Sequence, residues 1–320
     1  MNTQTAFFIS IDIGREKITC GLGNLGGELL RKSQMRDPRH WDKIVTAIDR
    51  EYGKCRKVWN DSSEQIKGIA IGAPGVVDIE RGTVTSSPNI NGPNEYPLRD
   101  RLSKYISAPI WIENDVNLAA MGEFWKQKES YDDIVYISMG TLIGGALIIN
   151  GNLFRGKRYY AGEVGWFIPG KEYLGRDLGK FGCPEALASG PALSRRAEEN
   201  VLRLSRRRDP RFLGKKITPE IIFGAYGKGV FWAKKTVDDW IKNIGITLCN
   251  ISSLMNPELI ILGGVLSFSA PLYLKKLEEL MARGTQCPPR IMVSDLKGKA
   301  PLYGGLKLCL DRYLEGLYVS

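Results

Sequence analysis

The stretch 110–123 constrains the fold of this 320-residue chain more than any other. Its first half is an apolar run that is typical of a buried strand, and its second half has the small and apolar residues of a helix. Glu113, Asn114 and Asp115 lie between the two halves, at the carboxyl end of the strand. Because ligands bind at that edge of an open α/β sheet, these three side chains are candidates for a binding site.

Two roles remain open for this polar tripeptide when it is taken alone. A carboxylate such as Asp115 can accept a proton from a substrate hydroxyl that comes within hydrogen-bond reach. Asn and Asp are also preferred residues at the N-cap of a helix, where they accept backbone hydrogen bonds. Capping is the commoner use of these residues, so the tripeptide by itself favours a cap.

The segments around this stretch predict an α/β protein in which one pattern occurs twice. Strands at 6–14 and 134–138 each lead into a Gly turn, and each is followed by a returning strand. The likeness is one of pattern and not of residue identity, and it suggests a duplicated unit. Further elements are expected as strands at 17–22, 28–32, 66–75, 143–149 and 258–264, and as helices at 41–54, 230–254 and 302–314.

The size and composition of the chain are typical of a soluble globular protein with two domains. The sequence is 43% hydrophobic and 25% charged, and no apolar run approaches the length that crosses a bilayer. The first five residues are polar and lack the basic and apolar regions of a signal peptide. We therefore expect no association with a membrane.

The cysteines and the single histidine indicate a cytoplasmic protein without a zinc site of the usual kind. Six cysteines are scattered along the chain with no close pair, which suggests free thiols in a reducing compartment. His40 is the only histidine, so a site of His and Cys ligands would lack most of its donors.

The net charge of +10 arises in large part from the segment between Arg195 and Lys216. One reading of this basic segment is a patch for nucleic acid or for an anionic ligand. The other is a solvated helix face that runs into a loop at Asp209-Pro210. The second reading is favoured, because neither interleaved aromatic residues nor a known binding motif accompany the charge.

Four short motifs follow one another along the chain and together carry a family resemblance. They are GAPGVVD at 72–78, ENDVN at 113–117, AGEVG at 161–165 and GCPE at 182–185. With ILGG at 261–264 they make the chain resemble the ROK family of sugar kinases and sugar-responsive repressors, from Ile9 to about Leu310. Each motif is weak alone, but their order makes coincidence a poor explanation.

The resemblance implies the actin-like, hexokinase-like ATPase fold. In that fold two actin-like (ribonuclease H-like) α/β domains flank an interdomain cleft, which we expect to be lined by Asp12, Asp115 and Glu163. Residues 1–117, joined by a C-terminal helix at 301–320, would form the N-terminal domain, and residues 118–300 the C-terminal domain.

The resemblance also implies roles for single residues on the sugar side. Asp115 matches the general base that deprotonates the sugar hydroxyl before it attacks the γ-phosphate, which outweighs the capping interpretation. Planar amides and carboxylates bind sugars well, because they pair with vicinal hydroxyls and leave polar groups unpaired when the wrong analogue enters. The other positions implied to bind the sugar are Gly75, Asn89, Asn114, Glu163 and Glu185.

On the nucleotide side the resemblance implies ATP and Mg²⁺ as cofactors. Asp12 matches the acid near the metal and the triphosphate. Gly14 and Gly140-Thr141 match two turns whose backbone N–H groups receive phosphate oxygens, and Gly263-Gly264 match the turn beneath the adenosine. Each of these glycines could equally be a plain turn former.

Both phosphate turns depart from the family pattern. The first usually reads Asp-x-Gly-Gly-Thr, whereas Arg15 and Glu16 follow Gly14 in this chain. Glu16 would repel phosphate where the family has a Thr hydroxyl, and Arg15 could offset that charge or bind the phosphate itself. In the second turn Leu142 replaces a Gly, and we expect it to hinder close approach of a ligand to the backbone.

The zinc motif of the family is missing. Trp166 stands where the family has a His that contacts sugar and, in many members, zinc, and residues 176–179 replace a Cys-x-Cys-Gly segment, so that only Cys183 remains. We therefore predict no structural zinc. Trp166 could stack on the apolar face of a sugar ring or could fill the core, and the sequence leaves both possibilities open.

The resemblance thus implies an ATP-dependent kinase of a hexose or amino-hexose. The alternative is a degenerate, non-catalytic relative that binds a sugar or a nucleotide and acts through a partner, and the altered phosphate turns favour it. A DNA-binding repressor is disfavoured, because only about five residues precede the first strand where such members carry a helix-turn-helix domain. A homodimer is expected by analogy with the family, and the sugar itself cannot be named.

Overall fold

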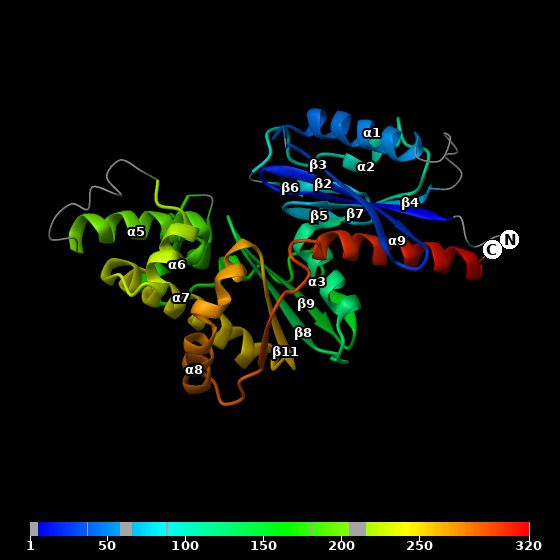
Figure 1. Cartoon of the computed structure of the whole chain (residues 1–320). Helices are drawn as coiled ribbons and strands as arrows, with labels where there is room; N and C mark the ends of the chain where they lie inside the picture. Colours follow the sequence, from blue (N-terminus) through cyan, green and yellow to red (C-terminus); the bar gives the residue numbers. More distant parts are fainter. Residues whose placement is uncertain are drawn as a thin grey trace. The chain divides into compact units, whose positions relative to one another are not determined.

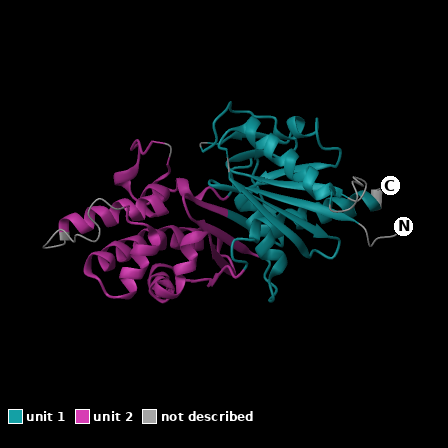
Figure 2. Cartoon of the chain, turned by 45° about the horizontal axis from the view of Figure 1, so that its top comes forward, with its two compact units in different colours: residues 1–132, 146–161, 296–320 teal, residues 133–145, 162–295 magenta. Residues whose placement is uncertain are grey.

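The computed structural model describes residues 6–36, 38–57, 66–87, 89–179, 181–204 and 216–319. It divides into two compact units, which are coloured separately in Figure 2. The first unit comprises residues 1–132, 146–161 and 296–320, and the second comprises residues 133–145 and 162–295. The domain boundary expected at residue 117 falls inside the helix Asp115–Lys126, and the whole of this helix belongs to the first unit. The division into domains at residue 117 stays a prediction.

The first unit is built on a five-stranded sheet with the order β3-β2-β1-β4-β7. Its strands are β1 (Phe7–Ile13), β2 (Lys17–Asn24), β3 (Leu29–Arg36), β4 (Ile66–Ala73) and β7 (Ile110–Asn114). β1, β4 and β7 run parallel, while β2 and β3 are antiparallel additions at one edge. The predicted strands are therefore confirmed, with the third one longer than expected. A short hairpin of β5 (Val76–Asp78) and β6 (Thr83–Ser86) follows β4.

Helices cover both faces of this sheet, as Figure 1 shows for α1 and α9. Ile9, Ile11 and Ile13 of β1 pack in one apolar cluster with residues of α1, whereas Phe8 packs in a second cluster with residues of α3 and α9. This alternation follows from the two-residue period of a strand, which turns successive side chains to opposite faces. The helices are α1 (Trp41–Lys57), α2 (Leu98–Leu102), α3 (Asp115–Lys126) and α9 (Ala300–Val319).

Glycines let α3 and α9 pack with their backbones in close contact. A Cβ atom placed on Gly304 of α9 would lie 1.7 Å from the Leu118 carbonyl oxygen of α3, and one on Gly122 would lie 2.0 Å from the Ala300 carbonyl oxygen. Any side chain at these positions would overlap the partner backbone. Helix α9 thereby completes the core of the first unit, to which β1 belongs.

The second sheet repeats the strand arrangement of the first, with the order β10-β9-β8-β11-β12. β8 is parallel to β11, and β11 is parallel to β12, while β9 and β10 form an antiparallel pair. Counted along the chain, both sheets therefore have the order 3-2-1-4-5, as the repeated sequence pattern suggested. The strands are β8 (Ile134–Met139), β9 (Ile143–Ile149), β10 (Asn152–Phe154), β11 (Leu259–Gly263) and β12 (Arg290–Val293).

The helices of the second unit surround an aromatic cluster of Phe223, Trp240 and Tyr273. The ring centroids of Trp240 and Tyr273 are 4.9 Å apart, and the Trp240 indole N–H donates to the Ala188 carbonyl at 2.7 Å. The helices are α4 (Cys183–Ala188), α5 (Gly190–Leu204), α6 (Pro219–Gly227), α7 (Phe231–Met255) and α8 (Leu274–Gly284), with short 3₁₀ turns η3 (Val164–Trp166), η4 (Lys171–Tyr173) and η5 (Val265–Leu272).

The long elements agree with the sequence predictions, and some short ones were not foreseen. α7 matches the helix expected at 230–254, and the final helix is longer than expected at both ends. α8 and β12 were not predicted. The basic segment begins on α5, and its residues 205–215 lie outside the described residues. No helix in the described ranges is both long and apolar enough to cross a membrane.

Candidate active site

Asn114 is the N-cap of α3 and connects it to the loop that follows β4. Its Oδ1 accepts hydrogen bonds from the backbone N–H groups of Val116 and Asn117 at 2.9 and 3.0 Å, and its Nδ2 donates to the Gly75 carbonyl at 2.9 Å. Gly75 has φ +100°, and a Cβ on it would lie 2.0 Å from the Ser86 carbonyl oxygen, so only glycine suits this position. The capping interpretation is therefore confirmed for Asn114, whose Nδ2 retains one further N–H.

Asp115 is the first residue of α3 and is half-buried. Its Oδ1 accepts a hydrogen bond from the N–H of Val116 at 3.0 Å. The N-terminal turn of a helix stabilises a negative charge, because its N–H groups and the helix dipole point toward it. This position therefore places the carboxylate beside the first N–H groups of α3.

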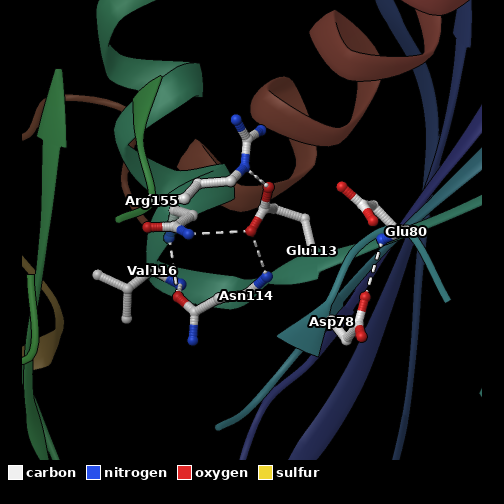
Figure 3. A network of polar contacts seen from close by, with 7 residues as sticks. Asp78, Glu80, Glu113, Asn114, Val116 and Arg155 are labelled. Atoms are coloured by element: carbon white, nitrogen blue, oxygen red, sulfur yellow. Dashed lines mark hydrogen bonds and ion pairs between the residues drawn. The ribbon is translucent and has the colours of Figure 1, made fainter. Parts of the chain in front are cut away.

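Glu113 lies directly before this cap and anchors a buried polar network (Figure 3). Its side chain is almost fully buried, yet three donors reach its carboxylate. Oε1 accepts from the Asn114 N–H and from the Asn117 Nδ2, both at 2.9 Å, and Oε2 accepts from Arg155 Nε at 2.7 Å. The network therefore ties the end of β7, the first turn of α3 and the segment after β10 to one another.

The sequence reasoning missed Arg155. A signal was present, because a glutamate at the end of an apolar strand has a high cost of burial unless a cation pairs with it. Arg155, the partner of Glu113, lies 42 residues further along the chain, so no local sequence pattern identifies the pair.

Asp78, the last residue of the GAPGVVD motif, organises a turn. Its Oδ1 accepts hydrogen bonds from the backbone N–H groups of Glu80 and Arg81 at 3.1 and 3.0 Å, and Figure 3 shows the first of these. The carboxylate thus has a structural role in the hairpin of β5 and β6.

Asp12 stands near the end of β1, before the first glycine turn. It is half-buried, and its side chain has no hydrogen-bond or ion-pair partner among the described residues. Burial raises the pKa of its carboxyl to about 6, against the opposing effect of the positive charges of Lys17 and Lys32. A carboxylate in these surroundings gains from a cation, which would replace its lost hydration.

The first glycine turn already uses the N–H of its glycine. Gly14 donates to the Lys17 carbonyl at 3.0 Å, closing the hairpin between β1 and β2. The N–H groups of Arg15 and Glu16 donate to no acceptor in the described part of the chain. A phosphate at this turn would therefore meet the N–H groups of Arg15 and Glu16, because the Gly14 N–H is already bonded. The match of this turn to a phosphate turn stays a prediction.

The second glycine turn also uses the N–H of its glycine, but it is one residue shorter than the first. Gly140 donates to the Leu142 carbonyl at 3.0 Å, and its own carbonyl accepts from the N–H of Gly190 at the start of α5 at 2.7 Å. The N–H of Thr141 has no acceptor within the described ranges. In both turns the residue after the glycine thus has an N–H group without a bonded acceptor among the described residues.

The second unit contains two acidic residues with raised pKa values, Glu163 and Glu185. Burial raises the pKa of the Glu163 carboxyl, and the negative charge of Glu185 adds to this effect. Burial also raises the pKa of Glu185, although the N–H groups of Gly182 and Ile143 donate to its two oxygens, each at 3.3 Å. Both carboxyl groups would gain from hydroxyl donors.

Trp166 ends the η3 turn with its side chain 59% exposed. This exposure excludes the core-filling interpretation and leaves the aromatic face accessible. Asn89 lies half-buried in the loop after β6. Their contact with a sugar stays a prediction.

The glycine pair at the end of β11 is required by packing. A Cβ on Gly263 would lie 2.0 Å from the Tyr136 hydroxyl, and Gly264 has φ +79° with the Met139 backbone 2.4 Å from its Cβ position. Packing therefore explains Gly263, the positive φ and the close backbone explain Gly264, and a role beneath adenosine stays a prediction.

The region of the missing zinc motif offers few donors. Cys183 is buried at the start of α4, and the described residues contain no cluster of three or more His, Cys, Asp or Glu side chains that could hold a metal ion. Trp166, Arg176 and Leu178 stand at positions to which the sequence resemblance assigns zinc ligands. The absence of zinc from the protein stays a prediction.

The candidate residues fall into two groups, one in each compact unit. Within the first unit the structure brings Asn114 into contact with Gly75, and within the second it brings Glu163 near Glu185. The first group is Asp12, Gly14, Arg15, Gly75, Asn89, Asn114 and Asp115, and the second is Gly140, Thr141, Glu163, Trp166, Glu185, Gly263 and Gly264.

Two sheets of the same strand order, with acidic side chains at the ends of β1 and β7, define a protein of the actin-like, hexokinase-like class. The sequence profile of the ROK family matches residues 8–312, and the chain belongs to this family.

Relatives with known names include both kinases and a regulator. A glucokinase of Streptomyces coelicolor is 30% identical, over 95% of this chain and 97% of the relative. A xylose repressor of Caldicellulosiruptor bescii is 29% identical, over 98% of this chain and 81% of the relative. The crystal structure of a ROK family glucokinase from Streptomyces griseus in complex with glucose and AMPPNP has a TM-score of 0.78 and 30% identity, covering 95% of this chain and 99% of that one.

Proposed function

We propose that this protein phosphorylates a hydroxyl of a hexose or amino-hexose with ATP, and that Asp115 is the general base. The observation that carries the proposal is the position of Asp115 in the first turn of α3, directly after the Asn114 cap and the Glu113 network. The kinases among the relatives support a reaction of this class.

In the proposed reaction Asp115 accepts the proton of the attacking sugar hydroxyl. The hydroxyl oxygen then forms a bond to the γ-phosphorus of ATP, and the bond to the ADP oxygen breaks. Phosphoryl transfer depends mainly on positioning and on neutralising charge. A rigid anchor for the base is therefore valuable, and the hydrogen bonds of Glu113 and Asn114 supply it.

The proposed sugar contacts are polar groups that still have hydrogen-bonding capacity. Asn114 can donate its second Nδ2 proton, and the carboxyl groups of Glu163 and Glu185 can accept from hydroxyls, which would relieve the cost of their burial. The exposed face of Trp166 can cover the apolar side of a sugar ring. Gly75 and Asn89 complete the proposed set.

The proposed nucleotide contacts follow the two glycine turns. The N–H groups of Arg15, Glu16 and Thr141 are available for phosphate oxygens, and the Arg15 guanidinium can offset the charge of Glu16. Asp12 fits Mg²⁺, because this ion is held in kinases by one or two carboxylates together with the phosphates. The bound metal would neutralise charge on the triphosphate. Gly263 and Gly264 are assigned to the adenosine.

A second candidate function is binding of a sugar without catalysis. Glu16 favours it, because this exposed carboxylate follows the first glycine turn and would repel phosphate there. The similarity to a xylose repressor shows that not every named relative is a kinase.

The test compares the unmutated protein with Asp115→Asn and with the control Asp100→Asn. Asp100 lies exposed in the first turn of α2, so the control repeats the same change at another helix start. A panel of hexoses and amino-hexoses is screened for ADP release and for thermal shift. We expect D115N to lower turnover by roughly 10²–10⁴-fold with sugar affinity largely kept, and D100N to have no effect.

Two outcomes would overturn the proposal. Unchanged turnover in D115N would remove Asp115 from the mechanism. A thermal shift with a sugar, without product from the unmutated protein at any sugar, would establish the binding function in place of the kinase.

A further inference from the structure

The second unit contains a cavity of about 300 Å³ that none of the proposed sugar or nucleotide residues lines. Its walls come from the η4 turn and the loop after it, from α4 and from α5. A volume of this size is at the lower end of the range for small-molecule sites, which favours a small ligand.

Positive charge dominates the lining of this cavity. Arg176, Arg195 and Arg196 contribute three guanidinium groups, and Glu199 contributes the only carboxylate of the lining. The cavity therefore carries two net positive charges when it is empty. The other lining residues are carbon-rich, with the ring of Tyr173 and the side chain of Leu178 among them.

The three arginines line the same cavity, and none of their contacts is with the Glu199 carboxylate. Arg195 donates from Nη2 to the Ala186 carbonyl at 3.0 Å, and the Arg176 guanidinium lies 5.6 Å from the centre of the Tyr173 ring. Neither contact neutralises the charge, and none of the three arginines forms an ion pair within the described ranges. Like charges gathered in this way repel one another, so a bound anion would relieve the repulsion.

We propose that this cavity binds a small phosphomonoester, with the phosphate held by Arg176, Arg195 and Arg196 and the carbon part against Tyr173 and Leu178. A phosphomonoester carries about −1.5 to −2 charges near neutral pH, which matches the net charge of the cavity. Guanidinium groups pair with phosphate oxygens through two parallel N–H donors, a geometry that Lys cannot offer. The apolar lining distinguishes an organic phosphate from the free ion.

The cavity shares helix α4 with Glu185, one of the proposed sugar-binding residues. Ala186 lies in the cavity wall, and the preceding residue of the same helix is Glu185. The hydrogen bond from Arg195 to Ala186 also connects α5 to this helix. The binding proposal itself does not depend on the function of Glu185.

The test is isothermal titration calorimetry of the full chain with glycerol 3-phosphate, with inorganic phosphate and with glycerol. Variants are the double substitution R195Q/R196Q on α5, the single substitution R176Q in the loop after η4, and the control R203Q. Arg203 is an exposed residue of α5 that does not line the cavity, so R203Q repeats the charge change on the same helix.

We expect glycerol 3-phosphate to bind the unmutated protein and R203Q equally, more weakly at high salt, and more tightly than inorganic phosphate does. R195Q/R196Q should lower the affinity by roughly tenfold or more. R176Q should also weaken binding of glycerol 3-phosphate. If the double variant fails to fold, the affinity of R176Q alone tests the proposal. Glycerol should not bind.

The proposal is overturned if glycerol 3-phosphate does not bind the unmutated protein. It is also overturned if R176Q and a folded R195Q/R196Q bind as tightly as R203Q does, because the phosphate would then occupy another site. Equal affinity for inorganic phosphate would overturn the assignment of the carbon part to Tyr173 and Leu178.

Discussion

Glu113 holds a negative charge at a position with 2% exposure, and Arg155 is the cation that pairs with it. Removing one partner of such a pair leaves an uncompensated charge, which is more damaging than loss of the contact alone. The Arg155 side chain is 25% exposed, so solvent screens part of the effect.

We predict that Arg155→Met lowers the free energy of unfolding by about 1–3 kcal/mol, and that Arg155→Lys lowers it less, because the charge is kept. Urea denaturation measures the change. Arg158→Met is the matched control, since Arg158 is exposed and lies three residues further along the chain. Equal stability of R155M and R158M would contradict the role given to the pair.

Glu163 gives a prediction of pH dependence. Burial and the nearby charge of Glu185 raise the pKa of its carboxyl in the folded state, so the folded protein holds this proton more tightly than the unfolded chain does. Stability from this group is therefore present below the unfolded pKa and is lost as the pH rises through the folded pKa.

Glu163→Gln removes the titrating charge and should raise the melting temperature at pH 8, with a smaller gain at pH 4. Thermal unfolding at the two pH values measures the difference. Glu172→Gln changes an exposed carboxyl of the neighbouring η4 turn and should show no such dependence. A gain in E163Q that is the same at both pH values would exclude a titration effect.

Single residues differ in how far their roles could be read from the sequence. The cap function of Asn114 and the place of Asp115 follow from a local pattern, because strand and helix signals meet at this point. Arg155 could not be found in this way, since its contact depends on how β10 lies against α3. The hydrogen bond from the Gly14 N–H to the Lys17 carbonyl could not be predicted from the sequence either, because it depends on the geometry of the hairpin turn.

At the scale of elements, the contact between α3 and α9 depends on glycine. We predict that Gly304→Ala destabilises the protein by about 1–3 kcal/mol, because the new methyl group would overlap the Leu118 carbonyl oxygen. Gly316→Ala in the same helix is the control, since a Cβ there has open space around it. That change should be neutral or slightly stabilising, as alanine favours a helix more than glycine does. Equal effects of the two changes in thermal unfolding would contradict close packing at Gly304.

The elements found from the sequence are those with long periodic patterns. α7 has apolar residues at helical spacing over 25 residues, which no strand pattern imitates. β12 has only four residues, its first side chain is exposed, and it pairs only with β11 in its sheet. A short edge strand of this kind owes its conformation to its neighbour and not to its own sequence.

At the scale of the whole molecule, the repeat of strand order 3-2-1-4-5 bears out the duplicated pattern of the sequence. The sequence did not reveal that residues 146–161 belong to the first compact unit, because such membership depends on tertiary contacts and not on local signals.

The first unit also needs the last helix of the chain. We predict that a variant ending at residue 295 loses the protection of β1 and β4 in hydrogen exchange, because Phe8 and Ala70 lose the apolar cover of Leu306 and Leu310. β8 and β11 should stay protected, since α9 belongs to the other unit. Retained protection in β1 would contradict the requirement for α9.

This dependence on α9 has a consequence for synthesis on the ribosome. The Cys309 thiol lies 3.8 Å from the Ile9 carbonyl oxygen, although 300 residues separate them in the sequence. At translation rates of about 5–20 residues per second, β1 waits roughly 15–60 s for its partner helix to be made. During that interval α3 can cover the Phe8 face of the nascent first sheet but α9 cannot, so part of this apolar face stays exposed to chaperones that bind newly made chains.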